Sequence, residues 1–154
     1  MISKKSLTKD QYDSFLELLA FIAWKLELKE LRNNPKNLKL GINTAISIAE
    51  TYAQNDLEIS LKNDLRPYLE KMTADPQMFE ELGNDHAFRE KLREVFRFMQ
   101  VSAENREIRS FSNFIYRFAY KLSEASGSTF SGLGKKVDAG EAEFLLVLKD
   151  ELPR

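Results

Sequence analysis

The feature that most constrains the fold of this chain is an apolar pattern with helical spacing that begins at Phe111. Its apolar side chains recur every three or four residues over about four turns, so they line one side of an α-helix. A helix of this kind buries its apolar side against other elements, which predicts a helix that faces a core. The pattern consists of Phe111, Phe114, Ile115, Phe118, Ala119, Leu122 and Ala125.

A glycine-rich segment follows this pattern. Gly127 is predicted to end the helix, because glycine readily takes the left-handed conformation that closes a helix C-terminus. The loop 127–137 contains three of the chain's six glycines. Asp138 and Glu141 then have the spacing of a capping box, which predicts a second helix through the apolar run 144–148. The two helix ends are therefore expected to lie close together.

The N-terminal third of the chain predicts two more long helices. Thr8 and Gln11 have the spacing of a capping box, and two apolar rows follow it between residues 12 and 31. Two rows widen the apolar face, so this helix is expected to be contacted from two directions. Asn34 and Pro35 then suit the N-cap and first turn of a helix that continues to about residue 55, with Gly41 a weak point.

Further helical patterns lie between residues 57 and 102. Pro67 cannot donate a backbone N–H, so a break or kink is expected there. Asp85 is predicted to cap one helix and Ser102 to cap the next, while residues 75–83 suggest a short helix. Strand signals are scarce. The chain is therefore predicted to be all-α, a single domain over residues 1–154 made of six to eight helices.

Composition excludes several classes of partner and location. The net charge is -1, with 23 Lys and Arg against 24 Asp and Glu, so no global field favours nucleic acid. Cysteine is absent, which removes disulfides and thiolate metal sites and favours a cytoplasmic protein. The longest runs without a charged residue span ten residues, far short of the roughly 20 that a membrane helix requires, and no signal-peptide pattern is seen.

The sequence gives only weak signals for a phosphate-binding loop and for a site built on histidine. The glycines of the 127–137 loop resemble a phosphate-binding loop in spacing, but Leu133 stands where a lysine must follow the second glycine. His86 is the only histidine and stands at a predicted helix start, with no second histidine or cysteine at ligand spacing. A connecting loop and a surface first-turn residue are the simpler interpretations.

Three carboxylates around the closing loop form the candidate metal site. Glu124 lies in the last turn of one predicted helix, whereas Asp138 and Glu141 lie at the start of the next. Hard divalent cations such as Ca²⁺ or Mg²⁺ take oxygen ligands of this type. The competing interpretation is that Asp138 and Glu141 serve only as N-cap and capping-box residues.

The C-terminal part of the chain also resembles the closing motif of the TerB-like family, which is linked to tellurite resistance. The resemblance lies in residues 118–127, the loop, and the sequence Val-Asp-Ala-Gly-Glu that ends at Glu141. Gly127 and Glu141 match the family's positions, while Ser126 stands where an acidic residue is expected. The resemblance implies an all-helical domain without enzymatic activity, which acts in stress responses through metals, membranes or partner proteins.

These observations predict a non-catalytic protein of a stress or tellurite-resistance context, which binds a divalent cation or a partner between its last two helices. The alternative is a helical adaptor or immunity-type protein that acts only by protein–protein contact, through a face that includes Tyr116 and Tyr120. An enzyme with paired carboxylates is a third hypothesis, but no pattern brings two acids together in an apolar pocket.

Overall fold

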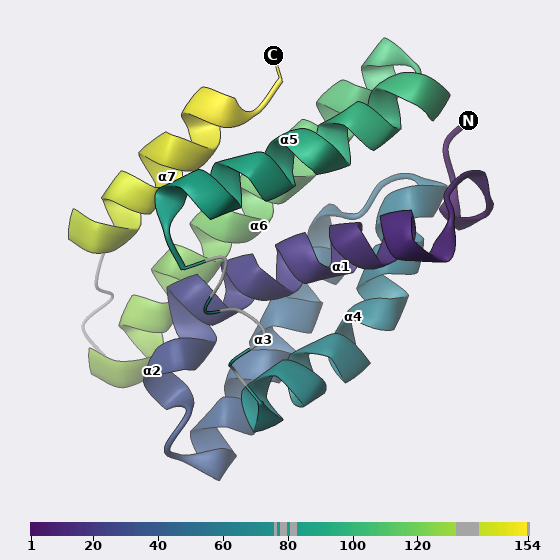
Figure 1. The fold of residues 1–154 in the computed structure, drawn as a ribbon. Coiled ribbons are helices and arrows are strands. Elements are labelled where there is room, and N and C mark those ends of the chain that lie inside the picture. The colour runs from purple at the N-terminus through teal and green to yellow at the C-terminus, as the bar shows by residue number, and fades with distance from the viewer. Residues whose placement is uncertain (76, 78–79, 81–82, 132–138, 154) are drawn as a thin grey trace.

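The computed structural model describes residues 1–75, 77, 80, 83–131 and 139–153, and for 126–131 and 139 it describes only the backbone. The described residues form an all-α, single-domain bundle without a strand, as predicted (Figure 1). Six long helices make up the bundle, joined by the shorter η1 (Lys4–Ser6), η2 (Trp24–Leu28) and α2 (Lys29–Leu31). The long helices are α1 (Lys9–Ala23), α3 (Pro35–Tyr52), α4 (Asp56–Ala74), α5 (Asp85–Ser102), α6 (Asn105–Ser131) and α7 (Ala139–Glu151).

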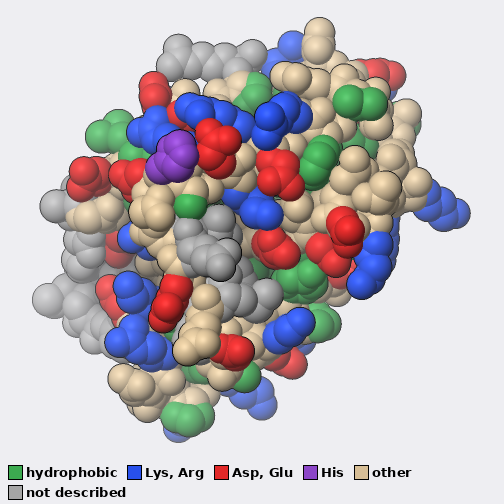
Figure 2. Space-filling model, in the orientation of Figure 1, with side chains coloured by type: hydrophobic (Ala, Val, Ile, Leu, Met, Phe, Trp, Pro, Cys, Tyr) green, Lys and Arg blue, Asp and Glu red, His purple; other side chains and the backbone are tan. Residues whose placement is uncertain are grey.

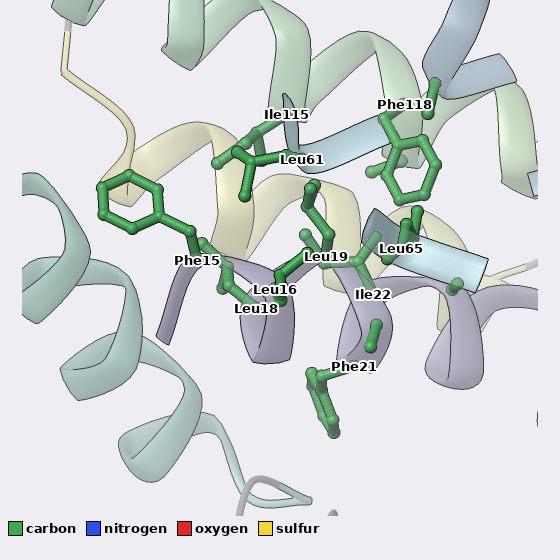
Figure 3. Packing of buried hydrophobic residues seen from close by; sticks show 14 of the residues in the cluster. Phe15, Leu16, Leu18, Leu19, Phe21, Ile22, Leu61, Leu65, Ile115 and Phe118 are labelled. Atoms are coloured by element: carbon green, nitrogen blue, oxygen red, sulfur yellow. The ribbon is translucent and has the colours of Figure 1, made fainter. Parts of the chain in front are cut away.

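Helix α1 lies at the centre of the bundle and is contacted from more than one side. It packs against α4, α5 and α6, and η2 and α2 continue it without interruption. Leu19 is fully buried, and Figure 3 shows α1 side chains lying among Leu61 and Leu65 of α4 and Ile115 and Phe118 of α6. The prediction of a central first helix with a wide apolar face is therefore confirmed.

Helix α6 buries the apolar side that its spacing predicts. Phe111 is fully buried, and its ring centroid lies 5.2 Å from that of Phe15 and 5.6 Å from that of Phe96. The rings of Phe114 and Phe118 continue the row along α6, with centroids 6.3 Å apart. This row of rings joins α6 to α1 and α5, so it ties together segments that are far apart in the sequence.

Local capping chemistry explains most helix starts. The Thr8 side chain accepts a hydrogen bond from the Gln11 amide while the Gln11 side chain accepts one from the Thr8 amide, so the predicted capping box is confirmed. Asn34 caps α3 as predicted. The predicted cap of α5 is wrong by one residue, because Asn84 accepts the bond from Ala87 at 2.8 Å. Ser102 is the last residue of α5 and does not cap α6.

Two predicted interruptions of helices are not found. Helix α4 continues through Pro67 without the break that was one of the two expectations there, and the lost backbone hydrogen bond is offset by the burial of Leu65 and Leu69 on either side. Helix α6 continues past Gly127 to Ser131. A glycine inside a helix costs only about 1 kcal/mol, and each added helical residue closes a further backbone hydrogen bond. Most of the predicted short helix at 75–83 lies outside the described residues.

Helix α7 covers one side of the bundle, beside α5 and α6 (Figure 1). Phe144 packs its ring on that of Phe88, with centroids 5.0 Å apart. At the C-terminal end of α7, Arg89 and Arg93 of α5 bind the Glu151 carboxylate, with closest contacts of 2.7 and 3.0 Å. Hydrogen bonds from Arg89, and then from Arg93, lower the pKa of Glu151. The apolar run 144–148 is therefore helical, as predicted, and α7 is anchored near its middle and at its C-terminal end.

Among the described helices, none combines the length and the apolar character that crossing a membrane would require.

Candidate functional site

Two of the three predicted metal ligands lie in the described part of the chain. Glu124 is in α6, and its Oε1 lies 3.4 Å from the Nζ atom of Lys121. Glu141 lies in the first turn of α7, as predicted. Asp138 lies outside the described residues, so its predicted role as an N-cap and ligand is not addressed. The packing of α6 against α7 places this region at one corner of the bundle, here called the α6–α7 corner.

Glu124 and Glu141 line different cavities of the corner. Glu124 lines a cavity of about 570 Å³ between α6 and α7, together with Tyr116 and Tyr120. Glu141 lines a cavity of about 480 Å³ next to Lys25 of η2. Among the residues whose positions are described, no three acidic or histidine side chains are grouped closely enough to hold a metal ion. Convergence of Glu124 with Glu141 therefore stays a prediction.

A carboxylate that the sequence analysis did not single out lies in this region. Glu27 is only 1% exposed, and neither of its carboxylate oxygens has a hydrogen-bond partner among the described residues. Burying an ionised carboxylate without a partner is costly, and such groups in folded proteins usually have a partner or a function. Glu27 is therefore the described residue that most clearly requires an explanation beyond packing.

The backbone around Glu27 is unusual as well. Residues 24–28 form a π-helical turn, in which the Lys29 amide donates to the Trp24 carbonyl oxygen. One extra residue per turn rotates the side chains that follow, and such turns occur frequently at functional sites. Glu27 thus lies within a single π-helical turn, between the α-helical segments α1 and α2.

Gly41 of α3 makes room for this turn. A Cβ atom at Gly41 would lie 2.7 Å from Leu31 Cδ1 and 2.9 Å from Leu28 Cδ2, both tighter than normal contact. The same Cβ position lies 3.8 Å from Glu27 Cδ. The absence of a side chain therefore lets α3 approach η2 and α2 closely, and the Glu27 carboxyl group lies against that contact. Gly41 is a close-packing point as well as the weak helix former that the sequence predicts.

Electrostatics connect Glu27 with Glu141. Burial is the main cause that raises the pKa of Glu27 from 4.5 to about 8, and the negative charge of Glu141 raises it further. The structure therefore brings one predicted ligand, Glu141, within electrostatic range of a buried carboxyl group that comes from the other half of the chain. Oxygen atoms of two carboxylates, one of them without hydrogen-bond donors, suit a hard cation.

A weak signal for Glu27 is present in the sequence. It stands four residues after Ala23 and four residues before Leu31, both of which are buried. Spacing of four residues keeps side chains on one side of a helix, so Glu27 falls on the buried side. A charged residue at such a position is the informative exception to an apolar pattern.

His86 lies in the first turn of α5 and is exposed, which agrees with its interpretation as a surface residue (purple in Figure 2). Gly127, which suggested a phosphate-binding loop by its spacing, lies within α6, while residues 132–138 of that segment are not described.

The cavity between α6 and α7 has a different character from the carboxylate region. The rings of Tyr116 and Tyr120 stack with their centroids 6.3 Å apart, and Leu145 and Leu146 of α7 face them across the cavity. Leu146 is 68% exposed and Tyr120 is 40% exposed. Two large exposed side chains beside one cavity form an apolar surface of the kind that the adaptor hypothesis requires.

Comparison of the chain with family models, with curated proteins and with solved structures finds no match.

Proposed function

We propose that this chain is a cytoplasmic, non-catalytic TerB-like protein of a stress or tellurite-resistance context, which binds a divalent cation at the α6–α7 corner. Glu27 and Glu141 supply the carboxylate ligands, with Asp138 as a third candidate from the segment before α7. Glu124 is a further candidate if α6 and α7 close around the ion. The observation that carries this proposal is the buried Glu27 carboxyl group, which has no hydrogen-bond partner among the described residues.

Charge and donor chemistry support a hard cation at this position. Two carboxylates that repel each other are both stabilised by a divalent ion between them, and Ca²⁺ or Mg²⁺ prefers oxygen donors. Binding requires the ionised form of Glu27, whose pKa is raised to about 8. A cation would therefore release a proton from Glu27 at neutral pH, and its affinity should rise with pH.

The first prediction concerns thermal unfolding of the EDTA-treated protein with and without millimolar Ca²⁺, Mg²⁺, Mn²⁺ or Zn²⁺. A ligand that binds only the folded state adds about 2.7 kcal/mol at a hundred times its dissociation constant. For a chain of this size, we expect one hard cation to raise the melting temperature by roughly 5–10 °C. Glu27→Gln and Glu141→Gln should each reduce that increase, as measured by calorimetry.

Glu50→Gln is the matched control, because Glu50 is an exposed residue of α3 and the substitution removes the same charge. The control should respond to the cation as the parent does. Equal responses of all three variants would show that the cation does not bind at the α6–α7 corner. If none of the four ions raised the melting temperature of the parent, Glu141 would have only the role of a helix-start residue.

A second candidate function is binding of a partner protein at the cavity between α6 and α7. It is favoured by the exposed Leu146 and Tyr120, whose apolar surface is in contact with water and would be buried by a partner. The lining also includes Glu124 and Lys149, so a partner would meet a polar rim around an apolar centre. This adaptor function needs neither a metal nor a catalytic group.

The second prediction tests this surface with a photo-crosslinking residue at position 146, introduced into the protein in its native cell. Because Leu146 is largely exposed, the substitution should change the free energy of unfolding by less than about 0.5 kcal/mol. We expect a crosslinked product of one defined mass, which is absent when the same residue replaces Glu143, an exposed position on α7. Identical products at both positions would count against a specific partner.

A further inference from the structure

Three basic side chains near the end of the first helical run surround two neighbouring cavities. Lys25, Lys29 and Arg32 line both the cavity of about 480 Å³ next to α7 and a second cavity of about 380 Å³. We infer that these two cavities, here called the basic pocket, bind a small molecule that carries a phosphate group and an apolar or ring portion. This inference does not require the cation proposed above, although Glu141 lines the larger of the two cavities as well.

The positive charges of the basic pocket are not neutralised by ion pairs within the described part of the fold. Lys25, Lys29 and Arg32 make no ion pair with any described acidic residue, whereas Arg89, Lys91 and Arg93 of α5 all do. Like charges four residues apart on a helix repel each other. A bound anion would remove that repulsion.

Helix capping accounts for only part of this arrangement. Arg32 Nη1 lies 3.4 Å from the Lys29 carbonyl oxygen, and positive charge is favourable at the C-terminus of a helix. Lys25 stands almost two turns before that end, where the effect of the helix dipole has faded. Capping therefore explains Arg32 better than it explains Lys25, and the three charges share only the two cavities.

The opposite wall of the pocket is the first turn of α7. Gly140 lines the larger cavity, and the first amides of a helix have no partners within that helix. Backbone N–H groups and the positive end of the helix dipole both favour an anion at such a start. Because Gly140 has no side chain, a ligand oxygen has access to the backbone there. Basic side chains and a helix start thus lie on two sides of one cavity.

The acidic residues of the pocket restrict which anion fits. Glu30 and Glu141 also line the larger cavity, so in its described lining three positive charges face two negative ones. Among the described residues that line the smaller cavity, Glu80 is the acidic one. The phosphate is therefore expected next to Lys29 and Arg32, which line both cavities. The planar guanidinium of Arg32 can donate two parallel hydrogen bonds to phosphate oxygens.

The remaining lining indicates the rest of the ligand. Leu26 and Phe144 line the larger cavity, while Phe21 and Trp24 line the smaller one. Cavities of 300–1,000 Å³ with apolar walls and a few polar groups are typical of small-molecule sites. Lys25, Lys29 and Arg32 are themselves exposed, but each of the two cavities they line has the size of a small-molecule site, which favours a small phosphate-bearing ligand over an acidic protein or a membrane.

The test uses the full chain in EDTA, so that its outcome does not depend on the proposed cation. Inorganic phosphate and phenyl phosphate are titrated at constant ionic strength while backbone amide signals are recorded by NMR. We expect saturable shifts concentrated at Lys29, Arg32 and Gly140, with tighter binding of phenyl phosphate. Shifts spread over the surface would overturn the site, and equal affinities of the two probes would overturn its apolar portion.

Variants provide a second, independent readout. The triple variant Lys25→Ala, Lys29→Ala, Arg32→Ala should weaken phenyl phosphate binding about tenfold or more, because hydrogen bonds to charged groups contribute strongly to affinity. The matched control Lys5→Ala, Lys71→Ala, Arg97→Ala removes the same charge from exposed positions outside the pocket lining. Equal affinities of the two triple variants would show that only net charge attracts the anion and would overturn the proposal.

Discussion

Replacing Glu27 with glutamine should remove a pH dependence of stability on the order of 3–5 kcal/mol between pH 5 and pH 9. Burial, assisted by the charge of Glu141, raises the pKa of Glu27 from 4.5 to about 8 in the folded protein. Each pKa unit corresponds to about 1.4 kcal/mol of preference for one protonation state. The folded state thus prefers the neutral carboxyl group by a large margin.

The direction of this dependence follows from proton linkage. Below pH 4.5 both states hold the Glu27 proton, so the fold has its full stability with respect to this group. Between about pH 4.5 and pH 8 only the unfolded state releases the proton, so the free energy of unfolding falls as pH rises. Above pH 8 both states are ionised and the loss is complete. Glu27→Gln cannot ionise, so it should match the parent near pH 5 and exceed it in stability near pH 9.

Chemical denaturation in EDTA at several pH values measures this effect directly. Glu50→Gln serves again as the control, because an exposed carboxylate should leave the parent's pH profile unchanged. Glu141→Gln should lower the apparent pKa of Glu27 by a smaller amount, since burial is the larger cause. Parallel profiles for Glu27→Gln and the parent would mean that Glu27 is solvated in solution.

Replacing Phe111 with alanine should lower the free energy of unfolding by about 3–5 kcal/mol, the usual cost of removing a fully buried phenylalanine ring. Phe111 is fully buried and contacts the rings of Phe15, Phe96 and Phe114 from three helices. The substitution therefore opens a cavity at the junction of α1, α5 and α6. Most domains of this size have a total stability of only 5–15 kcal/mol.

Urea unfolding followed by circular dichroism tests this prediction. Phe98→Ala is the matched control, since Phe98 of α5 is only partly buried and should cost clearly less. Phe111→Leu should recover part of the loss because it restores apolar volume. Similar losses for Phe98→Ala and Phe111→Ala would contradict the central position of Phe111 in the core.

The adjacent cavities of the α6–α7 corner suggest how the two proposed ligands relate. Glu141 belongs to the proposed cation site and also lines the basic pocket. A cation on Glu141 would reduce the repulsion between that carboxylate and a phosphate group nearby. Because each ligand would lower the electrostatic cost of the other, we expect their binding to be mutually favourable if both occur.

Local chemistry explains why much of the fold is predictable from the sequence. The Thr8 and Asn34 caps and the helical spacing from Phe111 depend on residues within a few positions of each other. Such interactions form in the same way in most tertiary surroundings. The predicted helix end at Gly127 and the predicted break at Pro67 are absent because their local costs are small enough for packing and continued hydrogen bonding to override them.

The positions of the site's carboxylates depend partly on the local sequence and partly on the tertiary structure. The sequence determined by itself that the described chain is an all-α bundle and that Glu141 stands at the start of the last helix, since periodicity and capping are local properties. Only the tertiary structure decided that Glu27 is buried, because its environment depends on the π-helical turn and on the close approach of α3 at Gly41. Burial and the field of a distant charge are sums over many residues, so the spacing of Glu27 from Ala23 and Leu31 gives only a weak local signal of them.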